Sequence, residues 1–138
     1  MQDKSIRWNR RQFVTAAGAA AAGAWSGSSL AQDASAPIVL GQSCALSGPS
    51  AQLGTQFSQG AKLYFDQLNA QGGVGRRLVE LRTLDDGYEP ERCVANTQKF
   101  LNDDVMALFG YLGTPTSMAA LPLLQKAKVP LIAPLTGG

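Results

Sequence analysis

Between residues 37 and 134 the sequence alternates short apolar runs with longer segments in which apolar residues recur every three or four positions. The runs are typical of strands, and the segments between them are typical of amphipathic helices. The expected strands cover residues 37–43, 78–84, 105–111 and 129–134. A strand that returns through a helix runs parallel to the strand before it. The sequence therefore predicts an α/β fold of three layers, a sandwich in which helices cover both faces of a parallel sheet.

The first expected helix carries its apolar residues at steps of three or four, which places them on one face. That face consists of Leu53, Phe57, Ala61, Tyr64 and Leu68. The glycine pair at residues 72–73 is expected to end the helix, because glycine adopts a left-handed backbone at little cost.

Prolines mark the start of the two later helices, since proline is tolerated in the first helical turn. The second helix is expected from Pro90 to about Asn102. In the third helix, Thr114 is the expected N-cap and precedes Pro115. The apolar face of this helix is expected to comprise Met118, Leu121 and Leu124.

Residues 1–31 differ in composition from the remainder of the chain. Basic residues, Arg10 and Arg11 among them, precede an alanine-rich run at residues 14–25 and a small-residue stretch that ends at Ala31. This order predicts an export signal cleaved after Ala31, and the adjacent arginines are typical of the twin-arginine type. The alternative, a basic or amphipathic arm, fits the order less well. A membrane anchor is disfavoured, because the apolar run is short of the roughly 20 residues that span a bilayer.

The basic charge of the chain belongs to this predicted leader. Removal of residues 1–31 takes away four basic residues and one acidic residue, which changes the formal charge from +2 to −1. The remainder has no basic cluster beyond Arg76 and Arg77, so neither nucleic acid nor anionic lipid is an expected partner. The chain contains no histidine, and its sequence offers no set of metal ligands. No metal and no cofactor are expected.

Two cysteines, Cys44 and Cys93, are free to pair in an oxidising compartment, although their pairing cannot be deduced from the sequence. A disulfide and two free thiols therefore both stay open. Cys44 lacks the sequence setting of a lipoprotein anchor, so the exported product is expected to be soluble in the periplasm.

The candidate binding site lies where open parallel sheets bind ligands, beyond the carboxyl ends of the strands. Thr114, Thr116 and Ser117 place three hydroxyls at the start of the third helix, where unpaired N–H groups and the helix dipole favour an anion such as a carboxylate. The alternative is that Thr114 only caps the helix and that the other two face water. Ser47 and Thr136, in loops after the first and last strands, are expected on the same rim.

Several linked motifs carry a family resemblance that runs from about residue 37 to the end. Residues 41–54 resemble the opening of type I periplasmic binding proteins of the leucine/isoleucine/valine class, and residues 66–74, Asp85–Asp86 and residues 110–112 continue the match. The resemblance implies a lobe of the type I fold. It also implies a two-lobed protein that closes on a small ligand, such as an amino acid or another carboxylate, and docks on an ABC permease in the inner membrane.

The resemblance also implies roles for individual residues. Thr114 occupies the position of a hydroxyl residue that contacts the ligand carboxylate, and Leu135 and Thr136 occupy the loop that holds the polar head of the ligand. Leu53 stands where some members carry a tyrosine, which leaves the identity of the ligand open. Tyr111 completes the expected contact set.

No enzymatic reading of the sequence is favoured. Residues 41–45 fall short of a nucleophile elbow, and no histidine is present to act as a base. Asp85 and Asp86 are more typical of a turn than of paired catalytic carboxylates. The expected function is solute binding for an ABC transporter; the alternative is a ligand-sensing domain of a receptor or regulator with the same fold.

The chain ends just past the last expected strand, on two glycines and without a further element to close the sheet. We therefore interpret residues 32–138 as the first part of an amino-terminal ligand-binding lobe that is incomplete as it stands.

Overall fold

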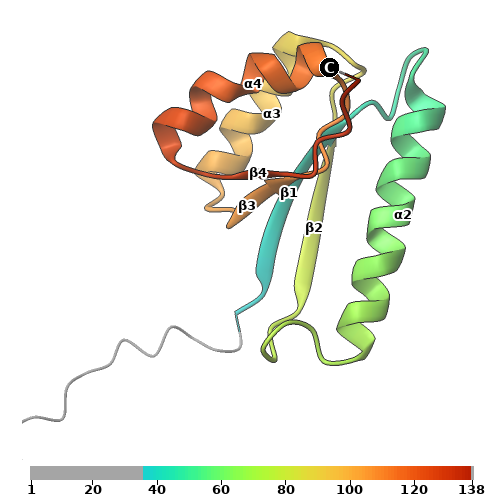
Figure 1. The fold of residues 1–138 in the computed structure, drawn as a ribbon, viewed down its shortest axis with the longest axis vertical. Coiled ribbons are helices and arrows are strands. Elements are labelled where there is room, and N and C mark those ends of the chain that lie inside the picture. Colours follow the sequence, from blue (N-terminus) through green and yellow to red (C-terminus); the bar gives the residue numbers. More distant parts are fainter. Residues whose placement is uncertain (1–35, 138) are drawn as a thin grey trace, which may run out of the picture. The chain divides into compact units, whose positions relative to one another are not determined.

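The computed structural model describes residues 36–137, which form alternating strands and helices (Figure 1). The strands are β1 (Ile38–Cys44), β2 (Val79–Asp85), β3 (Ala107–Phe109) and β4 (Leu131–Ile132). The helices are α2 (Ala51–Ala70), α3 (Pro90–Asn102) and α4 (Thr114–Ala127). The predicted signal residues Arg10, Arg11 and Ala31 lie outside the described residues.

The sheet is parallel throughout and has the order β2-β1-β3-β4. In this order β1 lies between its successor β2 and the later strand β3, so the direction of the connections reverses between β1 and β3. Figure 1 shows α2 on one side of the sheet and α3 with α4 on the other. The predicted α/β fold is confirmed, and the reversal creates a switch point at the carboxyl ends of β1 and β3.

Alternate residues of β1 pack on opposite faces of the sheet. Leu40 belongs to the cluster under α2, together with Val79 and Ala107. Its neighbour Gly41 faces the other layer, where a Cβ would lie 2.7 Å from the Phe100 ring of α3. Glycine is therefore required at this position, because α3 packs directly on the strand backbone.

The last two strands are shorter than the sequence predicts. The apolar run at residues 105–111 contributes only three residues to β3, and the run at residues 129–134 contributes two to β4. Gly110 and Ala133, which follow these strands, have positive φ angles of 61° and 49° and turn the chain out of the ladder. Of the flanking residues, Val105 and Tyr111 are buried, whereas Met106 and Ala133 are exposed.

The inward face of α2 differs from the predicted one. Leu53 and Tyr64, both expected to face the sheet, are 52% and 64% exposed. The predicted Leu68 packs on the cluster under the helix, and it is joined there by Phe65, while Gly54 is buried at the start of the helix. A Cβ on Gly54 would overlap the carbonyl of Ala45, so the helix begins with its backbone against the strand, and this contact sets its rotation.

The start and the face of α4 also differ from expectation. The N-cap is Gly113, with no side-chain capping bond, so Thr114 is the first helical residue and not the cap. Met118, expected inside, is exposed. The buried side of the helix comprises Thr116, Ser117, Ala120 and Leu124. Of the two buried hydroxyls, that of Thr116 is compensated for the loss of water by hydrogen bonds to the chain just before the helix.

Both cysteines are free thiols, and they lie on opposite sides of the sheet. The Cys44 sulfur is 3.9 Å from the carbonyl oxygen of Gly54 in α2, whereas Cys93 of α3 packs in the cluster with Phe100 and Leu108. The β1 backbone separates the two thiols, and the cysteines are unpaired in this structure.

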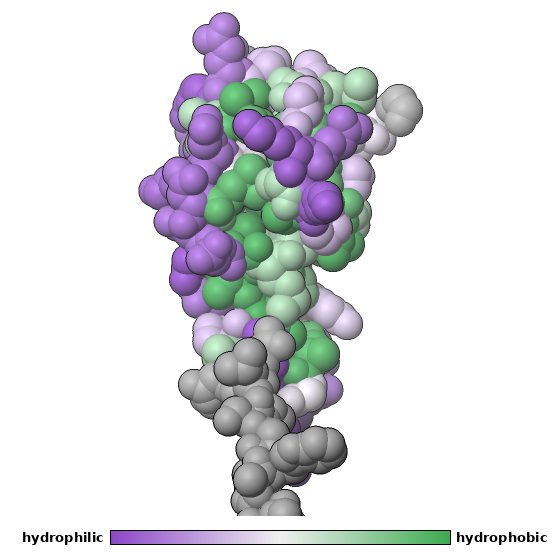
Figure 2. Space-filling view, turned by 90° about the vertical axis from the view of Figure 1, so that its left-hand side faces the viewer, coloured by the Kyte–Doolittle hydropathy of each residue, from purple (hydrophilic) through white to green (hydrophobic). Residues whose placement is uncertain are grey.

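On the α4 side of the molecule, hydrophobic residues form a band flanked by hydrophilic ones (Figure 2). Met106 and Ile132 are exposed, and β4 has no further strand on its outer edge among the described residues. Within residues 36–137, no helix is long and apolar enough to cross a membrane.

Candidate functional site

The loops after β1, β2 and β3 meet at the carboxyl end of the sheet, beside the switch point (Figure 1). The first two touch at Gly87, where a Cβ would lie 3.4 Å from Ser47 Oγ. The Tyr88 ring lies against Gly113 in the third loop, and the Gly113 N–H donates to the carbonyl of Leu135 at 2.9 Å. The loop after β4 therefore joins the other three. We call the continuous surface formed by these four loops the rim.

Asp85 holds the loop after β1 in place. Its Oδ1 accepts hydrogen bonds from the backbone N–H groups of Leu46 (2.7 Å), Ser47 (3.1 Å) and Gly87 (2.9 Å). Its Oδ2 accepts from Ser47 Oγ (2.6 Å) and Arg92 (2.8 Å). Desolvation opposes ionisation, but the donors from Ser47, Leu46, Gly87 and Arg92 outweigh it and lower the pKa of Asp85 well below its usual range.

The neighbouring carboxyl group, Asp86, points into the protein and is fully buried. It accepts hydrogen bonds from Ser43 Oγ (2.7 Å) and from the Tyr88 N–H (2.9 Å), and desolvation raises its pKa. Each of the two aspartates accepts the N–H two residues further along the chain, which is the geometry of an Asx turn. This geometry agrees with the turn expected from the sequence. Both carboxylates are bound by groups that hold the loops in place.

The predicted hydroxyl cluster separates in the structure into one exposed and two buried members. The Thr114 side chain is exposed at the start of α4. Thr116 is buried and donates its hydroxyl to the carbonyls of Leu112 (2.6 Å) and Gly113 (3.0 Å). The Ser117 hydroxyl is also buried and has no partner among the described residues. Of these three residues, only Thr114 is exposed at the rim.

Tyr111 lies beneath the rim rather than on it. Its side chain is fully buried, and its hydroxyl is 2.9 Å from the hydroxyl of Thr97 in α3. Desolvation raises the pKa of Tyr111, so the phenol stays protonated. The sequence interpretation of Tyr111 as a contact residue is therefore wrong for its side chain, since the polar end is satisfied inside the core.

The remaining predicted residues lie on the rim. Ser47 is exposed, although its hydroxyl is bound to Asp85. Leu53 in the first turn of α2 and Leu135 after β4 are exposed, and Thr136 is half-buried. Sequence reasoning missed Tyr88, which is exposed and follows the Asp–Asp–Gly turn at the end of β2. The rule that ligands bind beyond the strand ends would have pointed to it.

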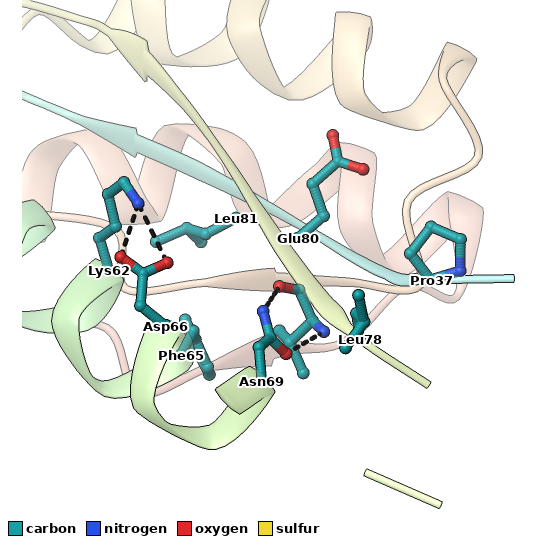
Figure 3. A pocket seen from close by; sticks show the side chains of 9 residues that line it. Pro37, Lys62, Phe65, Asp66, Asn69, Leu78, Glu80 and Leu81 are labelled. Carbon is teal, nitrogen blue, oxygen red and sulfur yellow. Dashed lines mark hydrogen bonds and ion pairs between the residues drawn. The ribbon is translucent and has the colours of Figure 1, made fainter. Parts of the chain in front are cut away.

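A hollow of about 330 Å³ lies elsewhere, between α2 and the beginning of β2 (Figure 3). Most of its polar groups are paired with one another: Lys62 with Asp66 at 2.7 Å, and Asn69 with both backbone groups of Val79 at 2.7 and 2.8 Å. The carboxylate of Glu80 instead pairs with Arg82 at 2.8 Å. Since β2 begins here, the hollow is at the opposite end of the sheet from the rim. No group of residues that could hold a metal ion occurs within the described part of the chain.

Comparison with known proteins places this fold in one family. The family model described as periplasmic binding protein matches residues 37–138. The Leu/Ile/Val-binding protein of Escherichia coli K12 is 30% identical over 111 residues, which are 80% of this chain and 29% of that protein. The chain thus spans less than a third of the length of this curated relative.

Solved structures support the same assignment. A possible leucine/isoleucine/valine-binding protein from Rhodopirellula baltica SH 1 has a TM-score of 0.72 and 37% identity, over 77% of this chain and 29% of that one. A solute-binding protein of an ABC transporter from Rhodopseudomonas palustris BisB5, in complex with 3,4-dihydroxybenzoic acid, has a TM-score of 0.67 and 29% identity, over 73% of this chain and 28% of that one. The chain therefore belongs to the periplasmic binding protein family and has the type I fold of that family.

Proposed function

We propose that this chain is part of the extracytoplasmic solute-binding component of an ABC transporter, and that the rim binds the carboxylate of a small ligand. The observation that carries the proposal is the exposed Thr114 at the start of α4, next to the switch point of a parallel sheet. Ligands of open α/β folds bind at this kind of position.

The start of α4 has the properties of an anion-binding site. The first-turn N–H groups of a helix have no partner within the helix, and here no side chain caps them. The positive end of the helix dipole adds to their attraction for an anion. Thr114 adds a hydroxyl donor at the same place. A carboxylate is the ligand group that best matches these donors.

The ligands named for the relatives share this group. One relative is described as binding leucine, isoleucine and valine, and a neighbouring structure contains 3,4-dihydroxybenzoic acid. These compounds differ in shape and in charge at the other end, but all of them carry a carboxylate. We propose that this common group is the one held by Thr114, with Leu135 and Thr136 on the adjacent loop.

The route to the transporter is part of the proposal. Residues 1–31 would act as a twin-arginine signal that is removed in the periplasm, and the ligand would pass to a permease in the inner membrane. A second lobe, as the family resemblance implies, would supply the opposite wall of the cleft.

Isothermal titration calorimetry on the full-length protein tests the binding role, with leucine, isoleucine and benzoate as probes. Loss of a hydrogen bond to a charged group costs about 1.5–3 kcal/mol, so Thr114→Val is expected to weaken binding roughly 10- to 150-fold. Thr114→Ser keeps the hydroxyl and is expected to bind nearly as well as the wild type. Equal affinity for the wild-type protein and Thr114→Val would contradict the proposed role of Thr114.

A further inference from the structure

Four large apolar side chains are exposed on the rim, each in a different segment. Leu46 follows β1, Leu53 lies in the first turn of α2, Tyr88 follows β2, and Leu135 follows β4. Exposure of single apolar residues is common, but these four all follow strand ends on the rim, and two of them, Tyr88 and Leu135, lie beside Gly113 at the start of α4. The rim therefore combines a donor group for an anion with apolar surface around it.

Tyr88 is the member of this group with the most constrained position. Its φ angle is +68°, a left-handed conformation that a bulky residue rarely adopts. The Tyr88 N–H is held by buried Asp86 at 2.9 Å, which fixes this backbone geometry. Strain of this kind persists where the surroundings enforce it, and it is frequent at binding sites.

The ring of Tyr88 fits a gap left by a glycine. A Cβ on Gly113 would lie 2.6 Å from Cε2 and 2.8 Å from Cζ of Tyr88, and Gly113 itself has a φ angle of +105°. The hydroxyl end of the ring thus lies beside the residue that caps α4 and precedes Thr114. Tyr88 is 38% exposed, so part of it stays open to a ligand.

We propose that Tyr88 determines specificity, by packing its ring against the planar body of an aromatic carboxylate whose carboxylate group lies at the start of α4. This inference rests on the proposed binding function and narrows its ligand class. An aromatic pair is more favourable than its buried area alone accounts for, and a tyrosine fixed by its backbone loses little side-chain freedom on binding. Leu46, Leu53 and Leu135 supply apolar contacts around the same space.

The test is calorimetry on the full-length protein with sodium benzoate and L-leucine as probes. The wild type is expected to bind benzoate more tightly than leucine. Tyr88→Phe keeps the ring and is expected to keep its benzoate affinity within about twofold, whereas Tyr88→Leu loses the aromatic pair and roughly 2- to 12-fold in benzoate affinity. Leucine affinity is expected to be the same in both variants.

Tyr64→Leu is the matched control, because Tyr64 is an exposed tyrosine in the later half of α2, far along the helix from the rim. This variant is expected to bind benzoate like the wild type. Melting temperatures of all three variants separate a loss of fold from a loss of contact.

Two results overturn the inference and leave the proposed function standing: leucine binds more tightly than benzoate, or Tyr88→Leu binds benzoate as well as Tyr88→Phe does. Failure of the wild-type protein to bind either probe would contradict the proposed carboxylate-binding function itself. It would also contradict the specificity role of Tyr88, which depends on that function.

Discussion

Asp85 binds Ser47 through both the backbone and the side chain: its carboxylate accepts the Ser47 N–H at 3.1 Å and the Ser47 hydroxyl at 2.6 Å. The two residues are 38 positions apart in the sequence; Asp85 is the last residue of β2, and Ser47 lies in the loop after the paired strand β1. The loop after β1 is therefore fixed by a side chain at the end of β2, and the rim has its shape before any ligand binds.

We expect Asp85→Asn to lower the free energy of unfolding by about 1–3 kcal/mol. The amide NH2 group is a donor, so it would face the donors of Arg92 and of the backbone N–H groups and leave some of them without an acceptor. Urea denaturation at neutral pH measures the change. Asp66→Asn is the control: it breaks an exposed ion pair with Lys62 and is expected to cost less than about 1 kcal/mol. Equal losses in the two variants would show that Asp85 is an ordinary surface charge.

The same carboxylate predicts a pH dependence of stability. The folded protein lowers the pKa of Asp85 from its ordinary value of 3.8, so the unfolded chain binds a proton more readily at acid pH. The stabilisation by Asp85 is therefore complete above about pH 5 and is lost as the pH falls through and below 3.8. We expect this loss to be smaller in Asp85→Asn, as measured by urea midpoints between pH 3 and pH 7; parallel curves would contradict the prediction.

Gly113→Ala is expected to destabilise the protein by about 1–3 kcal/mol, since alanine is strained at a φ angle of +105° and its Cβ would displace the Tyr88 ring. Chemical denaturation measures the change. Gly60→Ala in α2 is the matched control, because open space surrounds Gly60 and alanine favours the helix by about 0.5–1 kcal/mol. A neutral effect of Gly113→Ala would mean that this loop adjusts freely.

The two cysteines are expected to stay unpaired and unreactive in the folded protein. Burial raises the pKa of Cys44 to about 12 and that of Cys93 to about 11, and nearby Asp86 adds to both shifts. Thiolate is therefore scarce at neutral pH. Maleimide labelling followed by intact mass spectrometry should show modification at two sites only after denaturation. A mass lower by two hydrogens, without labelling in denaturant, would reveal a disulfide.

Export through the folded-protein pathway is predicted from the paired arginines of the predicted leader. Replacing both Arg10 and Arg11 with lysine is expected to leave unprocessed precursor in the cytoplasm, because this pathway recognises the pair. Immunoblots of periplasmic and cytoplasmic fractions measure the outcome. Arg7→Lys lies outside the pair and should be processed normally. Normal processing of the double variant would refute the prediction.

Local signals were enough to predict the order of elements. The expected range of α3, from Pro90 to about Asn102, agrees with the observed helix, because a proline in the first turn and an amphipathic repeat act over a few residues. The strands β1 and β2 begin and end one residue later than predicted. Strand and helix alternation was also enough to predict the parallel sheet.

The rotation of each helix and the identity of the rim residues depend on contacts between distant segments. Nothing near Leu53 and Tyr64 in the sequence shows that the backbone of Gly54 packs against Ala45 and turns both side chains outward. Likewise, the Tyr111 hydroxyl lies beside the Thr97 hydroxyl inside the core. Only the fold brings these two residues together.

The sequence predicts where the candidate site lies, and the structure shows which of its residues are exposed and which are buried. A hydroxyl cluster next to a proline predicts an anion-binding helix start, because the helix dipole and the unpaired N–H groups are local properties. The exposure of Thr114, the burial of Thr116 and the place of Tyr88 against Gly113 were decided only in three dimensions. The physical reason is that burial and contact are set by the chain segments packed on a residue, and these segments are far from it in the sequence.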